Sequence, residues 1–583
     1  FRPVFGRILK YLPEDSGGTY LREDGPQTPA DPRYAPRAMM LFALVEILCQ
    51  AYAQINGAQY RMYQGKEGNP RVLRHLVITY PSAMREEERR VYEALVRNAV
   101  ILTCHVLNIR PDLRPNYSAQ SGHFDPFLFV DEALAAQMVF VFQEVQGTFS
   151  GSMEELIGVY GHSAGKDGPN TIRVASVDIG GGTSDVMIAE YEDRLPGTGT
   201  SLSIKKLFQD GVGIAGDEVC RAILEDVVFE QILHQLPNAE SKGKLLHLFG
   251  EGDAGHGSAW RTLRARLVPY FWMPLARCFW AVAEGFTLPD HAPDRLYMVG
   301  DIQRIFELPT ISPAVLLEAD RFLSNEVPGF PGLENLFFKF DAQEVERAIE
   351  RVLREPLRRY ADILAQFGVD LLVLAGRTAA LPCIKALFTK EMPVPPPRIK
   401  SMARYRVGEW YPSKWKDQGH IKDPKSTVTA GAAVLHLASK NKIPGFLIDT
   451  VEEAPPTPIY GLYQDTEPHI ARSNELFREG NTSSPFVYTH GMRIGFRNVD
   501  SQEMEGSPLF EVRPATADVD AALLEDRVSI QFGKTRDGMI EIVKVTSQKG
   551  QYSFEPTDFV LSLKTAAYDR YWLDTGVFDV DHG

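Results

Sequence analysis

The chain has 583 residues, too many for one hydrophobic core, and its length predicts about three or four domains. Lysine and arginine total 62 against 76 aspartates and glutamates, so the formal net charge at pH 7 is −14. This acidic balance argues against a protein that coats nucleic acid or an anionic membrane surface.

The cysteines and the hydropathy of the chain narrow the class of protein and its cellular compartment. The five cysteines are scattered and form no C-x-x-C pair, which argues against a disulfide framework and a zinc site and for a reducing compartment, the cytoplasm. The most apolar window, residues 38–55, carries Glu46 and predicts a buried helix rather than a membrane span. Because the chain opens at Phe1, we also expect a fragment or a processed product of a longer protein.

The first part of the chain alternates between predicted strands and helices. Residues 1–36 are rich in glycine, proline and charge and are expected to be irregular. A short strand ends at Pro81, and Ser82 is the expected N-cap of a helix that continues to about residue 107. A second strand at 126–130 leads into another helix, which indicates α/β organisation.

Residues 172–189 carry the strongest local signal in the chain. An apolar run ends at Asp178, three glycines follow, and Thr183 and Asp185 open a second apolar run, so the pattern predicts a β-hairpin. Backbone N–H groups in such a bend can hold phosphate oxygens, because glycine has no Cβ in the way. Asp178, at the strand end, could hold a hydrated Mg²⁺. The alternative is an ordinary hairpin turn with a polar rim.

The middle of the chain continues the α/β pattern. A strand at 203–210 is followed by a glycine turn at Gly216 and by a helix beginning near Asp217, whose N-terminus could support a phosphate. Residues 225–340 are expected to be largely helical, with their aromatic side chains in the core. A charged amphipathic helix at 342–366 precedes a buried strand that ends at Gly376.

Beyond residue 445 the pattern changes from helical to alternating. Three prolines between residues 455 and 458 mark a linker, and turn signals such as Arg536-Asp537-Gly538 separate short apolar runs. We therefore expect a β-rich C-terminal domain over residues 446–583.

Several of these stretches, in this order, resemble the actin, heat-shock-70 and sugar-kinase ATPase superfamily. Residues 178–185 are similar to its second phosphate motif, and residues 131–136, Asp-Glu-Ala-Leu-Ala-Ala, are similar to the Asn-Glu-Pro-Thr-Ala-Ala of heat-shock-70 proteins. Residues 374–378 resemble the adenosine motif with Ala375 in place of one glycine, and residues 430–434 resemble the second connecting helix.

The resemblance implies ATP and Mg²⁺ as ligands and assigns roles to individual residues. Glu132 and Asp178 are the implied catalytic residues, and Asp178 and Asp185 are the implied metal ligands. The implied nucleotide-binding positions are Gly180, Gly181, Gly182, Thr183, Gly376, Arg377 and Thr378. Gly216, from the glycine turn after the strand at 203–210, is added to them as a phosphate-supporting position. Three of these residues have simpler alternatives: Arg377 as a surface salt-bridge partner, Glu132 as a charge favoured by the helix dipole, and Asp185 as a surface carboxylate.

A closer resemblance is to the bacterial virulence factor SrfB family. It is carried by Thr-Tyr-Pro-Ser at 79–82, by Leu-Ala-Gly-Arg-Thr-Ala-Ala-Leu-Pro at 374–382, and by the stretch from Arg406 to Thr427. The family implies a cytoplasmic protein of Gram-negative bacteria that is longer than this chain. It does not define a reaction.

The chain departs from the ATPase pattern at its start. Nothing before residue 75 matches the first phosphate motif, Asp-x-Gly-Thr/Ser on a first strand, and the related letters at 15–19 follow no strand pattern. The predicted fold is therefore α/β, an actin/heat-shock-70-like two-lobed ATPase with an incomplete first lobe. The first lobe is assigned to residues 1–170, the second to 171–224 and 341–445, a helical insert to 225–340, and the β-rich domain to 446–583.

Two functions remain open on this pattern. The first is ATP binding with Mg-dependent hydrolysis in the intact protein, coupled to a protein partner; this chain alone would lack the first motif that hydrolysis needs. The second is an interaction scaffold that keeps the fold without turnover. Neither nucleic acid nor a membrane span is expected as a partner, and the sequence does not indicate the oligomeric state.

Overall fold

The computed structural model describes two compact units, each made of several chain segments. One comprises residues 81–83, 131–453 and 569–583, and the other comprises residues 1–80, 84–130 and 454–568. Of the 583 residues, the structure describes Tyr34, residues 36–565 and residues 572–580. Internal gaps in this description are at 66–67, 72, 74, 83, 109–126, 164–169, 196–198, 213, 251–256, 290–294, 309–312, 453–457, 465–468, 478–479, 499–505 and 536–538.

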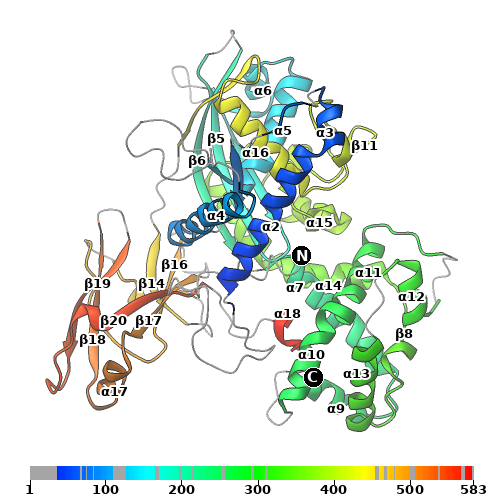
Figure 1. Cartoon of the computed structure of the whole chain (residues 1–583), viewed down its shortest axis with the longest axis vertical. Helices are drawn as coiled ribbons and strands as arrows, with labels where there is room; N and C mark the ends of the chain where they lie inside the picture. Colours follow the sequence, from blue (N-terminus) through cyan, green and yellow to red (C-terminus); the bar gives the residue numbers. More distant parts are fainter. Residues whose placement is uncertain are drawn as a thin grey trace. The chain divides into compact units, whose positions relative to one another are not determined.

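The first unit is built on a seven-stranded sheet in the order β10-β9-β4-β5-β6-β13, with β3 paired to β4. Figure 1 labels two of these strands, β5 and β6. Strands β4, β5 and β6 form an antiparallel meander, β9 runs parallel to β4, and β10 runs parallel to β9. Their bounds are β3 His162–Ser163, β4 Asn170–Ile179, β5 Ser184–Asp193, β6 Thr200–Val212, β9 Leu371–Ala375, β10 Ile399–Ser401 and β13 Phe446–Glu452. The predicted hairpin at 172–189 is thus confirmed.

Helices pack on this sheet because the central parts of its strands are buried: residues 186–189 of β5 and 371–375 of β9 are fully buried. Helix α5 (Glu132–Gln143) packs on β4, β5 and β9 and against α16 (Ser426–Ser439). At that crossing Gly431 allows the close approach, because an added Cβ would collide with the carbonyl of Ala135. The other helices of this region are α6 Met153–Tyr160, α7 Gly216–Ile223, α14 Ala342–Gln366 and α15 Pro382–Glu391.

A helical region follows β6, as the sequence predicts for residues 225–340. It contains α8 Glu230–His234, α9 Ala239–Phe249, α10 Ser258–Leu267, α11 Met273–Ala283, α12 Val299–Ile305 and α13 Pro313–Glu326, with a short β7–β8 pair (Tyr297–Met298 and Phe337–Phe338). Its aromatic residues Phe271, Trp272 and Phe279 are buried, as expected of core side chains, whereas Tyr270 is half exposed.

Two pieces of the predicted C-terminal β-rich stretch lie in this first unit. Strand β13 pairs in parallel with β6 at the edge of the large sheet. Residues 572–580, which include α18 Trp572–Thr575, pack into the helical region: Phe578 is fully buried against the rings of Phe229 and Trp272. Aromatic contacts of this kind add to the apolar area they bury.

The second unit contains a pair of helices and two antiparallel sheets. Helices α2 (Pro36–Asn56) and α4 (Glu86–Val106) pack together, α3 spans Ala58–Tyr63, and β1 (Leu76–Tyr80) pairs with β2 (Phe127–Asp131). Helix α4 begins after Arg85 and carries three glutamates in its first turn. The prediction of Ser82 as its N-cap is therefore wrong; the Ser82 hydroxyl donates to Asp131 instead.

Helix α2 is the part of the described chain that could cross a membrane by length and composition, at residues 37–56. Its buried face, however, packs in a protein core: Met40, Leu41 and Leu44 belong to a cluster with Leu95 and Val96 of α4. One such helix does not indicate a membrane span.

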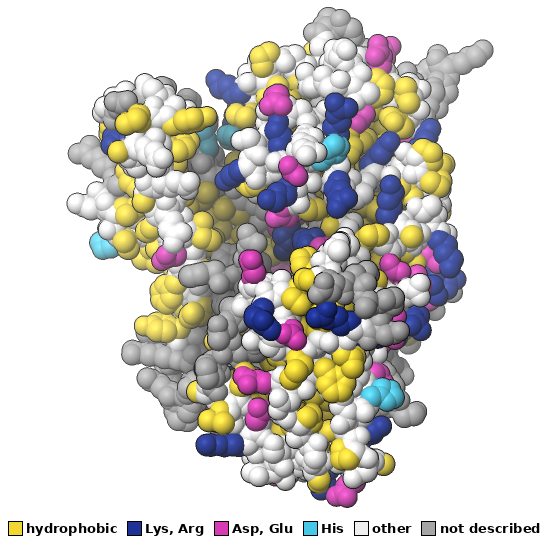
Figure 2. All heavy atoms as spheres, turned by 90° about the vertical axis from the view of Figure 1, so that its right-hand side faces the viewer, with side chains coloured by type: hydrophobic (Ala, Val, Ile, Leu, Met, Phe, Trp, Pro, Cys, Tyr) yellow, Lys and Arg dark blue, Asp and Glu magenta, His cyan; other side chains and the backbone are white. Residues whose placement is uncertain are grey.

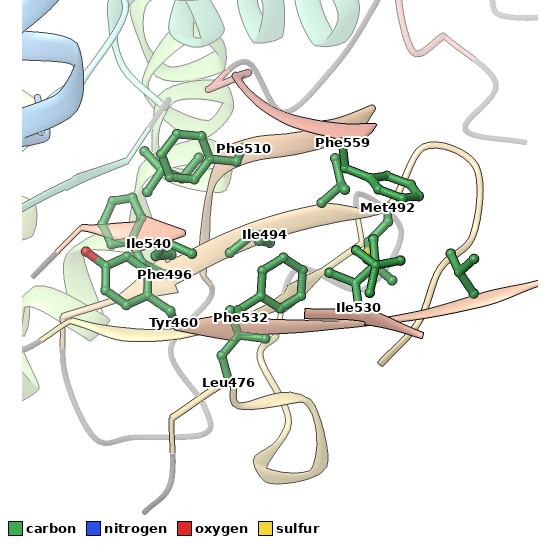
Figure 3. Packing of buried hydrophobic residues seen from close by; sticks show 14 of the residues in the cluster. Tyr460, Leu476, Met492, Ile494, Phe496, Phe510, Ile530, Phe532, Ile540 and Phe559 are labelled. Carbon is green, nitrogen blue, oxygen red and sulfur yellow. The ribbon is translucent and has the colours of Figure 1, made fainter. Parts of the chain in front are cut away.

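The remaining strands of the second unit form a β-rich core. A four-stranded sheet has the order β14-β16-β17-β20 and a three-stranded sheet the order β15-β18-β19. Figure 3 shows the apolar side chains that both sheets bury between them, including Ile494, Phe510, Ile530 and Phe532. The bounds are β14 Ile459–Tyr463, β15 Phe486–Val487, β16 Arg493–Arg497, β17 Ser507–Pro514, α17 Ala517–Glu525, β18 Val528–Lys534, β19 Ile540–Ser547 and β20 Phe559–Leu563.

Candidate functional site

Asp178 lies near the carboxyl end of β4, next to the turn that follows β9. The parallel register of these two strands places Asp178 opposite Ala375, so Gly376 comes directly after the contact. Gly376 has a φ of 83°, and an added Cβ would collide with the carbonyl oxygen of Ile179 and with Asp178 Oδ1. Only glycine fits this position, because both its conformation and its surroundings exclude a side chain.

The glycine bend between β4 and β5 is held by two other turns. The carbonyl oxygen of Gly180 accepts from the N–H of Gly216 at 3.1 Å and from Thr378 Oγ1 at 3.2 Å. The carbonyl of Gly181 accepts from the N–H of Asp217 at 2.6 Å. The hairpin bend, the start of α7 and the turn after β9 therefore meet at one end of the sheet, although about 40 to 200 residues separate them in sequence.

Gly181 is the open point of this arrangement. It is exposed, and an added Cβ would meet no described atom within 4 Å. Thr378, by contrast, is 1% exposed, and Gly376 is buried. The bend thus offers accessible backbone next to a packed wall, a geometry that suits a ligand approaching the main chain.

The carboxylate of Asp178 is buried without a hydrogen-bond donor from the described residues. Its residue is 8% exposed. Burial raises the pKa of Asp178 to about 6; the positive charge of Lys425 lowers it, and the negative charge of Asp131 raises it. An anionic group held in this way is destabilising until a cation or a proton reaches it.

Thr183 and Asp185 form a pair at the start of β5. Thr183 Oγ1 donates to Asp185 Oδ2 at 2.8 Å, and Asp185 is opposite Asp178 in the antiparallel register. Asp185 is 5% exposed, which excludes the alternative of a surface carboxylate. The Thr183 hydroxyl would have to turn away from Asp185 to donate to a phosphate.

The Arg377 side chain is engaged by an acidic residue of the helical region. Its guanidinium pairs with both carboxylate oxygens of Glu284, and Glu284 also accepts from Trp280 Nε1 at 2.9 Å. Arg377 is a half-exposed ion-pair partner in this structure, which is the simpler of its two predicted roles.

Glu132 occupies the first turn of α5 and is half buried. The residue before it, Asp131, was not assigned a role from sequence, although an aspartate directly before an apolar helical run is a standard N-cap signal. Asp131 caps α5 and is 1% exposed. Its charge is one of those that act on Asp178.

The site supplies few protein ligands for a metal ion. No group of three or more histidine, cysteine, aspartate or glutamate side chains that could hold a metal occurs among the described residues. The carboxylates at hand, Asp178 and Asp185, suit a hard cation that keeps most of its water, as Mg²⁺ does.

A family model for the virulence factor SrfB matches residues 6–579. The chain belongs to the SrfB family. The match extends over both units and every residue of the site described above, and membership suggests a virulence-associated role. A search of curated proteins found no match to this SrfB-family chain.

Proposed function

We propose that this SrfB-family chain binds ATP with Mg²⁺ at the end of the large sheet, in the manner of the actin and heat-shock-70 superfamily that its motifs resemble. The observation that carries the proposal is the meeting of three glycine turns around Gly180, with Asp178 beside them. The phosphate bend and the adenosine turn need to be adjacent if one nucleotide is to touch both.

The topology of the sheet supports the superfamily assignment. An antiparallel meander of three strands is followed by two strands parallel to its first member, with helices between them. Ligands of open α/β sheets bind outside the carboxyl ends of such strands, which is where Asp178 and Gly376 lie. We take this sheet as the second lobe of a two-lobed ATPase and the α2–α4 region as part of the first.

Each residue has a role in this proposal. The backbone N–H groups of Gly181 and Gly182 receive the phosphates. Gly180 and Gly216 shape the bend beside them, because their N–H groups donate to the carbonyls of Thr183 and Gly180. Gly376 and Thr378 line the nucleoside. Asp178, with Asp185 beside it, holds Mg²⁺, which when bound offsets the charge of the phosphate oxygens. Thr183 donates to a phosphate oxygen and Glu132 orients water.

Coupling of the nucleotide to a protein partner is the role we propose for the two-lobed body, in the cytoplasm. The partner and the oligomeric state are open. Hydrolysis requires a second phosphate-binding hairpin opposite Gly181, and no described residue of this chain supplies one.

A non-hydrolysing scaffold is the second candidate, and two contacts favour it. The Thr183 hydroxyl donates to Asp185, and the Arg377 guanidinium is paired with Glu284. Each contact must be broken or compensated before ATP can be held tightly.

Thermal unfolding with and without Mg·ATP tests the proposal, with a Gly181→Val variant as the specific probe. A ligand present at a hundredfold excess over its Kd stabilises by about 2.7 kcal/mol, a shift of several degrees. Gly181→Val places its side chain in open space, so the free protein should unfold as the wild type does while the shift with Mg·ATP is lost.

The matched control is Gly243→Val. Gly243 is an exposed glycine of α9, in the same unit, and an added Cβ there also meets nothing within 4 Å. This variant should keep the nucleotide shift. If the wild type shows no shift with Mg·ATP, ADP or AMP, the nucleotide proposal is wrong and the scaffold stands; if it binds but releases no phosphate, binding without turnover is the function.

A further inference from the structure

Asp131 uses only one of its two carboxylate oxygens. Oδ1 accepts from Ser82 Oγ at 2.6 Å, from the N–H of Ala133 at 2.9 Å and from the N–H of Leu134 at 3.1 Å. Oδ2 is buried and has no hydrogen-bond partner in the described part of the chain. A buried charged oxygen without a partner costs free energy that the cap does not need.

Capping by itself does not explain this arrangement. Asp341 caps α14 through a single bond, from the N–H of Gln343, and it is only partly buried, so water can reach its other oxygen. An asparagine or a serine would cap α5 as well as an aspartate does, without burying a charge. The full charge of Asp131 therefore calls for a different reason.

The start of α5 faces the same side of the sheet as Asp178. Ser176, two residues before Asp178 and on the same face of β4, donates to the carbonyl of Ala133 at 3.3 Å and accepts from Gln137 Nε2 at 2.9 Å. Two carboxylates are thus gathered at one place, one without a hydrogen-bond donor and one with a free oxygen.

We propose that Asp131 Oδ2 is an anionic contact for the divalent cation of the nucleotide site, which it shares with Asp178. The inference rests on the proposed function and extends it, because it adds Asp131 to the carboxylates that face the hydrated cation. No three such side chains of the described residues lie close enough to ligate one ion directly, so we expect water to bridge part of this contact. Carboxylate oxygens are the ligands that Mg²⁺ prefers, and a cation there satisfies both the free oxygen of Asp131 and the carboxylate of Asp178.

The test is a titration with Mn²⁺, followed by electron paramagnetic resonance, with and without ADP. Asp131→Asn keeps an oxygen for the cap and removes the charge, so α5 should form as before while the affinity for Mn²⁺ falls about tenfold or more. Asp341→Asn changes a helix cap elsewhere in the same unit and should leave the Mn²⁺ affinity unchanged.

A second variant guards against a folding defect. Ser82→Ala removes a donor to Oδ1 but leaves the charge of Asp131, so it should bind Mn²⁺ as the wild type does even if its thermal midpoint falls. If Asp131→Asn binds Mn²⁺ with wild-type affinity, Asp131 is a helix cap and the inference is overturned.

The outcomes for ADP and Mn²⁺ separate the two proposals. If the wild type binds ADP and Mn²⁺ and Asp131→Asn loses neither, only the inference about Asp131 fails. If the wild type binds Mn²⁺ without any nucleotide affinity, and Asp131→Asn loses it, the cation site stands and nucleotide binding fails. A wild type that binds neither ligand overturns both.

Discussion

Two buried aspartates, one in each unit, are held in opposite ways. Asp526, in the β-rich unit, accepts from Ser547 Oγ at 2.6 Å and from the N–H groups of Lys549, Gln551 and Tyr552 at 3.0 to 3.3 Å. Those bonds, that of Ser547 first, lower the pKa of Asp526. Asp178 receives no such donors from the described residues, and burial raises its pKa to about 6.

The difference separates a structural carboxylate from a candidate functional one. The donors around Asp526 close the turn after β19, so its charge is already stabilised and needs nothing further. The buried charge of Asp178 lowers the free energy of unfolding, and it lies beside exposed backbone at Gly181. Residues that destabilise a fold in this way are often those that bind or react, and this is why we place the site at Asp178.

The largest expected effect comes from filling the space beside Asp178. Gly376→Ala forces a Cβ against the carbonyl of Ile179 and the Asp178 carboxylate and also strains a positive φ, so we expect a loss of about 3 to 5 kcal/mol in unfolding free energy. Urea unfolding of the variant and of the wild type measures this difference in free energy.

Gly419→Ala is the control for that variant. Gly419 has a φ of 80° but nothing within 4 Å of an added Cβ, so the strain alone should cost about 1 to 2 kcal/mol. Equal losses for the two variants would mean that the turn after β9 is not packed against Asp178.

The second prediction concerns pH and sharpens the contrast between the two aspartates. A folded-state pKa of about 6 against the usual 3.8 means that the folded protein binds the Asp178 proton more tightly than the unfolded chain, so stability falls as pH rises from about 4 to about 6. Asp178→Asn should therefore be up to about 3 kcal/mol more stable than wild type above pH 6, with the gain vanishing below pH 4.

Asp526→Asn should behave in the opposite sense. The lowered pKa of Asp526 stabilises the folded state above the usual aspartate pKa, and that contribution disappears as pH falls through the lowered value. The variant should be less stable than wild type at pH 7 and approach it in acid. Thermal midpoints from pH 3 to 8 measure the stability of both variants. If both are more stable than wild type at pH 7, or both less stable, the contrast between the two aspartates is wrong.

The smallest expected effect comes from releasing Arg377. Glu284→Gln removes the carboxylate that holds the guanidinium but keeps an oxygen for Trp280 Nε1. Because Arg377 is half exposed, stability should change by about 0.5 kcal/mol or less. Arg377 is one of the nucleotide-binding positions that the resemblance implies, and a guanidinium released from Glu284 can stack on an aromatic base. The variant should therefore bind ADP about three- to tenfold more tightly in a calorimetric titration.

Weaker ADP binding in Glu284→Gln would show that the ion pair, rather than the free guanidinium, supports the site. Figure 2 shows basic and acidic side chains interspersed with apolar ones on one face of the molecule. Half-exposed pairs such as Arg90–Glu86 and Arg354–Glu350 occur on other helices. The readout is therefore ligand affinity, which an ordinary surface pair would leave unchanged.

Local patterns predicted the elements that carry the site. The hairpin at 172–189, the strand that ends before Gly376 and the helix at 342–366 are all present, because apolar periodicity and glycine turns act over a few residues. The first residues of α4 were predicted wrongly, since Ser82 is drawn to Asp131, 49 residues away, rather than to its own helix.

The sequence by itself determined that this chain is a mixed α/β protein with a glycine-rich bend after a buried strand. Only the tertiary structure decided what that bend contacts: Gly216 and Thr378 at Gly180, Glu284 at Arg377, and the free oxygen of Asp131 near Asp178. It also decided that β13 and Phe578 pack with the first unit rather than with the β-rich strands that lie between them in sequence. Pairings over such distances along the chain depend on which buried surfaces fit together, and no local pattern of residues records that fit.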